Sequence, residues 1–231
     1  MSQLFENRGF VVPGDVLAEG NLRSGENTYR LHGKIYATRV GLVEYSQGVV
    51  SVIALEANYE PRIGEIVIGT VLDVDLSGWV VNIEGPSLAL LNVSDALDEP
   101  FKPEMVLPNI FDLGDLIVAK VVSLGRDGTP KLSTLGLNLG RVGSGRLVRM
   151  TPSKIPRLIG KKGSMVNMII KETGCQIVIG QNGIILVNSK ERDMEDLVVQ
   201  VMQKIESEAH TTGLTNRIYE FIREMKEKRK R

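Results

Sequence analysis

All nine prolines of this 231-residue chain lie at or before Pro156, and their distribution limits where long helices can form. Proline breaks a helix interior and glycine favours turns, so the earlier part of the chain should fold from short strands. The strand-like runs near the N-terminus, which are β-branched or alternating, are 10–12, 28–32, 34–40 and 49–55. The sequence therefore predicts a small N-terminal β unit over residues 1–62.

A second set of strand-like runs follows a plausible linker at residues 61–64. The runs are 65–72, 79–83, 88–93, 116–122 and 131–135. Five short strands in one segment are most economically arranged as a closed barrel, because closure removes the exposed sheet edges. We therefore expect residues 63–143 to form a five-stranded, OB-like barrel.

After Gly145 the pattern changes to an α+β order. We expect a strand at 146–150, a helix at 153–159 with Ser153 as N-cap, and a helix capped by Ser164 and ended by Gly174. Strands at 176–179 and 184–187 and helices at 191–208 and 214–225 should follow. The prediction is a multidomain, β-rich chain with an α+β module at 144–210. A C-terminal helix and basic tail at 211–231 would complete it.

The tetrapeptide Gly160-Lys161-Lys162-Gly163 separates the two helices of this module. Glycines without side chains let a phosphodiester backbone approach the main chain closely. A helix that begins at about Ser164 directs its unpaired N–H groups and positive dipole end toward the same point. Two lysines add positive charge, so this loop is the strongest candidate in the chain for contact with a nucleic acid.

The formal net charge is zero, with 28 basic and 28 acidic residues, but the charges are unevenly distributed. Residues 1–62 carry a net charge of −1, residues 63–143 of −6 and residues 144–231 of +7. Nine Lys or Arg and no Asp or Glu lie between residues 128 and 171. A basic segment of this kind favours an anionic partner, although a solvated surface with counter-charges elsewhere would have the same composition.

The run Ile155-Pro156-Arg157-Leu158-Ile159-Gly160-Lys161-Lys162-Gly163-Ser164, in its strand–helix–loop–helix–strand–strand–helix context, resembles a type I KH module. The family clamps about four nucleotides with such a loop. Residues 64–143 resemble the S1-type RNA-binding version of the OB fold, through Gly78-Trp79-Val80-Val81-Asn82-Ile83 and Leu90-Leu91-Asn92-Val93-Ser94. Asn92 stands where many members of that family have His, and the net charge of −6 differs from an ordinary RNA groove.

One such barrel and one KH module after a β unit that opens with Val12-Pro13-Gly14-Asp15 resemble the S1–KH cap subunits of the archaeal exosome. The resemblance implies a non-catalytic cytoplasmic subunit that captures single-stranded RNA. It would feed the 3′ end to a hexameric ring of phosphorolytic subunits, beside other cap subunits in a trimeric cap. In that family the N-terminal unit makes most of the ring contacts.

These resemblances assign expected roles to particular residues. The RNA-binding candidates are Gly160, Lys161, Lys162, Gly163, Ser164, Arg157, Ile159, Lys154 and Arg149 in the KH module, and Lys131, Arg126, Lys120 and Trp79 in the barrel. The partner-binding candidates are Val12, Pro13, Gly14, Asp15 and Tyr36. No cofactor, metal or catalytic residue is expected.

Other functional classes remain as alternatives. An S1–KH transcription elongation factor or a ribosome-associated RNA-binding factor would share the modules. An elongation factor of the S1–KH–KH kind would need a second GxxG module, and residues 189–231 are helical and too short for one. A nuclease would need converging carboxylates, and the barrel acids from Asp73 to Asp115 have no fixed spacing that brings them together. A scaffold without an RNA role has no need for the GKKG loop.

Composition excludes several further classes. The single cysteine, Cys175, excludes an internal disulfide and a cysteine-ligated zinc site, and it fits a reducing compartment. Two histidines leave little material for a metal centre. No apolar run approaches the roughly 20 residues of a membrane helix, and the N-terminus has no signal-peptide pattern, so we expect no membrane association.

Overall fold

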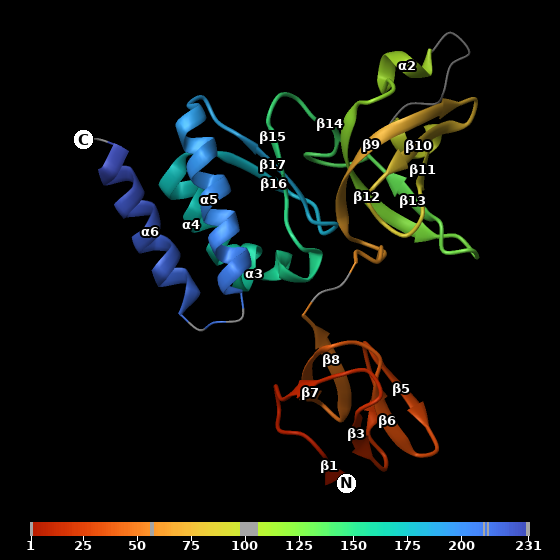
Figure 1. Cartoon of the computed structure of the whole chain (residues 1–231). Helices are drawn as coiled ribbons and strands as arrows, with labels where there is room; N and C mark the ends of the chain where they lie inside the picture. Colours follow the sequence, from red (N-terminus) through yellow and green to blue (C-terminus); the bar gives the residue numbers. More distant parts are fainter. Residues whose placement is uncertain (1, 56–57, 98–105, 210, 212, 230–231) are drawn as a thin grey trace. The chain divides into compact units, whose positions relative to one another are not determined.

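The computed structural model describes residues 2–55, 58–97, 106–209, 211 and 213–229 (Figure 1). The chain divides into two compact units, Met1–Ala57 and Asn58–Arg231, and each is described by itself. Within the described ranges, no helix is both long and apolar enough to span a bilayer.

The N-terminal unit is a sandwich of two four-stranded sheets. The first has the order β1-β3-β6-β5 and the second β2-β7-β8-β4. Their bounds are β1 Ser2–Gln3, β2 Phe10–Val11, β3 Val16–Glu19, β4 Arg23–Ser24, β5 Thr28–Leu31, β6 Lys34–Ala37, β7 Gly41–Ser46 and β8 Val49–Ala54. Leu17 and Ile35 from one sheet pack with Val43 and Val52 from the other in a single buried cluster. The predicted β unit is present, with more strands than the sequence indicated.

The barrel at the start of the second unit has five strands and is closed, as predicted. Its strands are β9 Ile66–Asp75, β10 Gly78–Asn82, β11 Ala89–Asn92, β12 Leu116–Leu124 and β13 Pro130–Ser133. Strand β13 pairs in parallel with β11 and antiparallel with β12, and these two pairings close the sheet. Short helices α1 (Val93–Ala96) and α2 (Leu107–Ile110) follow β11, and β14 (Gly140–Arg141) extends the edge of β12.

The C-terminal module has the predicted KH element order. Its elements are β15 Arg146–Arg149, the 3₁₀ turn η1 Pro152–Lys154, α3 Ile155–Ile159, the 3₁₀ turn η2 Lys161–Gly163, α4 Ser164–Thr173, β16 Gln176–Ile179, β17 Ile184–Asn188, α5 Arg192–Glu208 and α6 Leu214–Arg229. The antiparallel sheet has the order β15-β17-β16, and the helices cover one of its faces (Figure 1). Leu214, Ile218 and Ile222 of α6 are buried in the same core as α5, so α6 is an integral layer of this module.

The helix ends refine two predictions about capping. Ser153 lies inside η1 rather than at the N-cap of α3, which is Lys154, so that prediction is wrong. Helix α4 begins at about Ser164 as expected, but its N-cap is Gly163 and no side-chain cap hydrogen bond is made, so the predicted Ser164 cap is also wrong. Gly174 ends α4 in the left-handed conformation, with φ 69° and ψ 7°, as the sequence predicted.

Candidate nucleic-acid interface

The loop between α3 and α4 has a backbone that only glycine can adopt at its first position. Gly160 has φ 74° and ψ 175°. A Cβ atom there would lie 2.7 Å from the backbone nitrogen of Met165 and 2.8 Å from its Cβ. This contact fixes the close packing of the loop against the first turn of α4, and it explains why the chain has glycine at this position.

The rest of the loop presents its lysines outward. Lys162 has φ 54° and ψ 33°, a left-handed conformation, and Gly163 follows with φ 80°. Lys161 and Lys162 are both exposed. Neither ammonium group has an ion-pair partner among the described residues. Two unpaired positive charges therefore lie next to a stretch of accessible main chain.

The start of α4 adds a second attraction for an anion. The ten-residue helix has glycine at its N-cap, so no side chain occupies the N–H groups of the first turn. The aligned peptide dipoles place a partial positive charge at this end. Arg157, exposed on α3, and Lys154, half-buried in η1, lie on the elements just before the loop. Bare backbone, a helix N-terminus and basic side chains are thus combined in the segment 154–164, as expected for a phosphate-binding surface.

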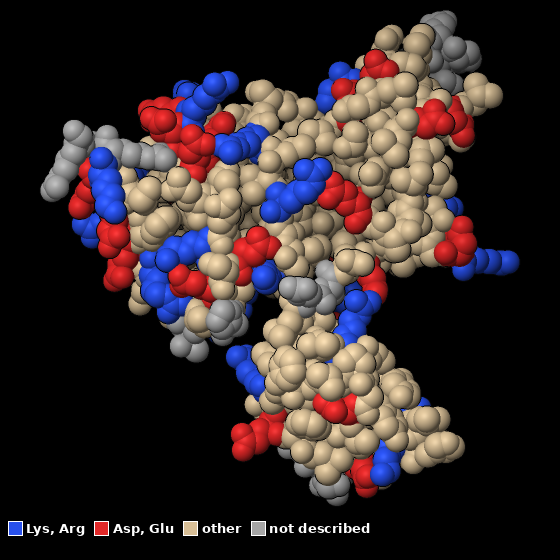
Figure 2. Space-filling model, viewed as in Figure 1, with Lys and Arg blue, Asp and Glu red and all other residues tan. Residues whose placement is uncertain are grey.

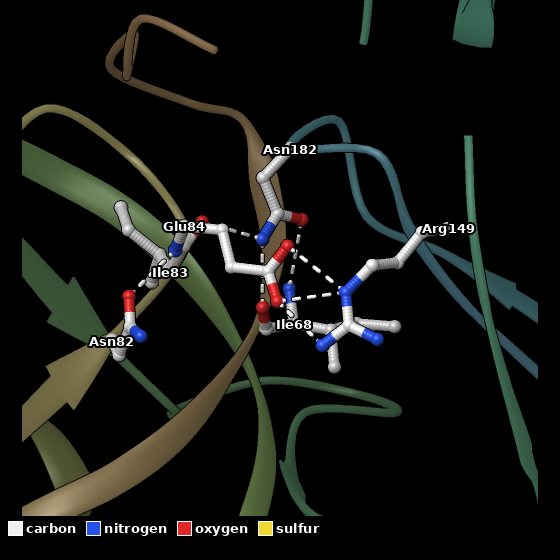
Figure 3. Close-up of polar contacts among 6 residues, drawn as sticks. All are labelled: Ile68, Asn82, Ile83, Glu84, Arg149 and Asn182. Carbon is white, nitrogen blue, oxygen red and sulfur yellow. Dashed lines mark hydrogen bonds and ion pairs between the residues drawn. The ribbon is translucent and has the colours of Figure 1, made fainter. Parts of the chain in front are cut away.

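Ile159 and Arg149 have additional structural roles. Ile159 is half-buried and packs against the KH core, so only part of its side chain can meet a ligand. The Arg149 guanidinium donates from Nη2 and Nε to Oε1 of Glu84, at 2.7 Å and 3.0 Å (Figure 3). The hydrogen bond and negative charge of Glu84 raise the pKa of Arg149. Arg149 therefore contacts the barrel, and a phosphate would have to compete with Glu84 for it.

Trp79 lies in the core of the barrel and not on its surface. Its side chain is 2% exposed, and its Nε1–H donates to the Phe111 carbonyl at 2.8 Å. The two rings meet edge to face, with centroids 5.3 Å apart. Trp79 has the same strand parity as the buried Val81, so it points inward. A ring in this position cannot stack on a base, and we remove Trp79 from the candidate RNA site.

The three basic barrel candidates are exposed. Lys120 lies on β12, Lys131 on β13, and Arg126 in the loop that joins these two strands. Lys131 pairs with Ser123 and Lys120 with Ser133, so both lysines lie on one antiparallel ladder.

The viewed surface carries charges of both signs. On the helices of the KH module, basic and acidic side chains lie side by side (Figure 2).

The partner-binding candidates form an ordered turn and part of a sheet face in the N-terminal unit. The N–H of Val12 donates to Oδ2 of Asp15 at 2.8 Å, and the N–H of Gly14 donates to the Ala37 carbonyl at 2.9 Å. Val12 and Pro13 are exposed at this turn. Tyr36 stacks on Tyr29 across β5 and β6, with ring centroids 5.2 Å apart.

The barrel acids that the structure describes do not converge into a metal site, and Asp98 and Glu99 lie outside the described residues. Among the described residues, no group of three or more His, Cys, Asp or Glu side chains could hold a metal ion. Asp115 instead accepts from Arg141 at 2.5 Å, and Asp95 accepts from the amide of Asn92 at 3.2 Å. These two carboxylates therefore stabilise the barrel locally by accepting hydrogen bonds from neighbouring side chains.

Sequence reasoning missed a set of contacts between the barrel and the KH module, formed by Glu84, Gln181 and Asn182. The sequence contains one signal of this contact. The run Ile184-Ile185-Leu186-Val187 is apolar without alternation, which is typical of a strand buried on both faces. The KH helices cover one face of β17, so a second layer had to cover the other.

Comparisons with known proteins agree with this architecture. A family model described as the exosome RNA binding protein RRP4 N-terminal domain matches residues 8–56, and the KH domain model matches residues 147–203. A protein of Thermococcus kodakarensis named exosome complex component Rrp4 is 43% identical over 235 residues, covering 98% of this chain and 91% of that protein. A protein of the same name from Sulfurisphaera tokodaii is 40% identical over 223 residues, covering 95% of this chain and 90% of that protein.

A solved structure is similar in three dimensions. A crystal structure described as that of a candidate exosome complex RNA-binding protein matches 75% of this chain and 99% of its own, with a TM-score of 0.68 and 37% sequence identity. The sequence and structure comparisons thus converge on the same group of proteins.

Proposed function

This chain belongs to the Rrp4 family of exosome components, and from that premise we propose that it is a non-catalytic RNA-binding subunit of an archaeal exosome. It captures single-stranded RNA and directs the 3′ end to a hexameric ring of phosphorolytic subunits in the cytoplasm. Together with other cap subunits it forms a trimeric cap on that ring. The predicted functional division is residues 1–62 for ring contact, 63–143 for the barrel, 144–210 for the KH module and 211–231 for the C-terminal helix and tail.

The observation that carries this proposal is the exposed loop Gly160-Lys161-Lys162-Gly163 at the start of α4. It supplies main chain at two glycines, a helix N-terminus without a side-chain cap, and two ammonium groups that have no ion-pair partner in the part of the chain that the structure describes. A phosphodiester backbone satisfies all three features at once, because it is extended, anionic and rich in acceptors. Because the recognition is of backbone and charge, we expect modest, salt-sensitive affinity for one chain, with tighter capture when several copies act together.

The N-terminal unit supports the proposed attachment to a protein ring. On the outer face of β5 and β6, Tyr29 and Leu31 are 43% and 47% exposed, and Tyr29 stacks on Tyr36. The neighbouring Lys34 is already paired with Glu19 at 2.8 Å. Exposed tyrosine and leucine beside a neutralised charge are typical of a protein interface rather than an RNA groove. We place the ring contact on this face and on the turn 12–15.

The direct test is reversal of the loop charge. We expect Lys161→Asp with Lys162→Asp to weaken binding of a short single-stranded RNA at least about tenfold, since two phosphate contacts become repulsive. The fold should stay intact, because both side chains are exposed and the loop geometry is set by its glycines. Filter binding and far-ultraviolet circular dichroism measure the two effects.

A matched control changes the same charge elsewhere in the KH module. Lys190→Asp with Arg192→Asp alters two exposed basic residues at the start of α5 by the same total charge. If the control weakens binding as much as the loop variant, the effect is general electrostatics. The proposed clamp would then be wrong. Unchanged affinity in the loop variant would also remove the loop from the mechanism.

A further inference from the structure

The sequence contains a single Asn-Gly pair, Asn182-Gly183, in the turn that joins β16 to β17. Asparagine before glycine loses its side-chain amide readily, because glycine has no side chain to hinder ring closure. The main-chain nitrogen of the glycine bonds to Cγ of the asparagine, and the Cγ–Nδ2 bond breaks. The glycine N–H proton leaves with the side-chain nitrogen as ammonia. Water then opens the cyclic imide at either carbonyl, which gives aspartate or isoaspartate.

The groups that would react at this pair are engaged in hydrogen bonds in the folded chain. The Nδ2 amide of Asn182 donates to the carbonyls of Ile68 at 2.7 Å and Ile83 at 2.8 Å (Figure 3). Its Oδ1 accepts from the N–H of Ile68 at 3.3 Å. The N–H of Gly183, which belongs to the attacking nitrogen, donates to the Gly180 carbonyl at 3.1 Å. Ring closure therefore requires these hydrogen bonds to break first.

The main chain around the pair is also closely packed. Asn182 is 4% exposed, so the water that would open the imide has little access. Gly183 is buried as well, and a Cβ atom there would lie 2.3 Å from the carbonyl oxygen of Met150. The carbonyl of Gly183 accepts from the N–H of Met150 at 2.9 Å. Asn182 can therefore react only from a conformation in which this turn has opened.

The turn that joins β12 to β13 has a similar backbone but is not buried. The N–H of Gly128 donates to the Gly125 carbonyl at 3.0 Å, as the N–H of Gly183 does to the Gly180 carbonyl. The φ angle is 83° at Gly128 and 86° at Gly183. Asp127, which precedes Gly128, is exposed. The two turns thus differ mainly in the surroundings of the residue before the second glycine.

The product of the reaction cannot restore the hydrogen bonds of Asn182. A carboxylate at this position has no N–H to donate to the carbonyls of Ile68 and Ile83, and its negative charge would be buried against them. Isoaspartate in addition carries the main chain through its side-chain carbon, in a turn that packs closely against Met150. Deamidation would therefore make the opening of the turn irreversible.

We propose that Asn182 is a latent deamidation site. The folded chain suppresses the reaction, and a chain whose turn has opened is converted to a form that cannot return to the native contacts. The modification is a permanent chemical record of opening. It consumes only water and releases ammonia, and it does not depend on the proposed RNA binding.

The test compares two Asn-Gly pairs within one molecule. Asp127→Asn creates the second pair in the exposed turn, where an amide oxygen can accept from the N–H of Thr129 as the carboxylate does. The full-length variant is incubated below its melting temperature in mildly alkaline buffer, and in parallel in urea. Peptide mass spectrometry follows the conversion of amide to acid at positions 127 and 182. The wild type shows whether the substitution itself changes the rate at Asn182.

In the folded variant, conversion at position 182 should be at least about tenfold slower than at position 127, because three buried side-chain hydrogen bonds have to break. In urea the two rates should become similar, since neither turn is retained. Wild-type chain that is held in urea and then refolded should lose native protein in step with conversion at Asn182. Thermal unfolding followed by circular dichroism measures that loss.

Equal rates at the two positions in the folded variant would overturn the suppression. Slow conversion at both positions would overturn it as well, because the turn backbone would then protect each pair without burial. Refolding of the converted chain to the wild-type melting temperature would overturn the irreversible step. None of these results bears on RNA binding, which the variant with Lys161→Asp and Lys162→Asp tests separately.

Discussion

Gly160→Ala is the substitution whose effect follows most directly from the loop geometry. At φ 74° and ψ 175° the backbone lies in a region that only glycine populates freely, and forcing alanine there costs about 1–3 kcal/mol. The added methyl group would also lie 2.7 Å from the backbone nitrogen of Met165. Met165 is 3% exposed and belongs to α4, so it cannot move aside, and such overpacking adds about 1–3 kcal/mol.

The combined loss of about 2–6 kcal/mol should lower the melting temperature by at least about 4 °C for a chain of this length. Relaxation of the strain moves the loop away from α4, so RNA affinity should fall as well. Thermal unfolding followed by circular dichroism and filter binding of a short RNA measure both effects. Gly174→Ala is the control: Gly174 also has a positive φ of 69°, but a Cβ atom there meets nothing within 4 Å.

Because Gly174 lies at the opposite end of α4, its alanine variant should lose only about 1–2 kcal/mol and keep its RNA affinity. The reasoning would be refuted if Gly160→Ala were as stable as Gly174→Ala and bound RNA like the wild type. The close packing of the loop against Met165 would then contribute nothing to either property.

Two further predictions concern charge and chemistry. The hydrogen bonds from Lys204 and Arg217 hold the pKa of Glu208 below its ordinary value, so Glu208 stabilises the α5–α6 contact at neutral pH and loses this effect as pH falls through that lowered pKa. Glu208→Gln should therefore melt below the wild type at pH 7, and the difference in melting temperature should shrink as the pH falls through the lowered pKa of Glu208. A difference independent of pH would contradict this. The purified chain with RNA and phosphate should release no nucleoside diphosphates, because the proposal assigns phosphorolysis to the ring subunits. Release by the chain alone would show that the subunit is catalytic.

Most of the second unit could be predicted from local sequence signals. The five barrel strands are short apolar runs between turn residues, and their closure follows from the need to remove sheet edges. The KH element order follows from two glycines, a helix N-terminus and a hairpin that lie close together in the sequence. Gly174 ends α4 where expected because a left-handed C-terminal residue needs no tertiary partner to be recognised.

The predictions from the sequence are wrong where tertiary contacts determine the local structure. The predicted runs 34–40 and 49–55 leave Gly41 outside any strand, yet it lies in strand β7, where a Cβ atom would be 2.2 Å from the Ile53 carbonyl oxygen. That glycine is required by close packing and not by a turn. Trp79 was considered for the binding face by resemblance, although its parity with Val81 directs it into the core. The Ser153 cap was wrong because the chain forms a 3₁₀ turn before α3.

The contact between barrel and KH module was not predicted, since it joins residues more than 60 positions apart. Asn182 resembles an ordinary turn residue in the sequence, and only the folded structure places its amide against Ile68 and Ile83. The unbroken apolar run of β17 is a local sequence pattern that indicates this contact. Such a run indicates that a partner layer exists without saying which part of the chain provides it.

The central claim, that this chain caps an exosome ring, is tested most directly by the mass of the assembly. The purified chain is mixed with a purified archaeal ring of six phosphorolytic subunits, and native mass spectrometry gives the composition of the complex. The proposal predicts a species with three copies of this chain on one hexameric ring. A ring that retains its own mass in the presence of excess chain would contradict the proposal.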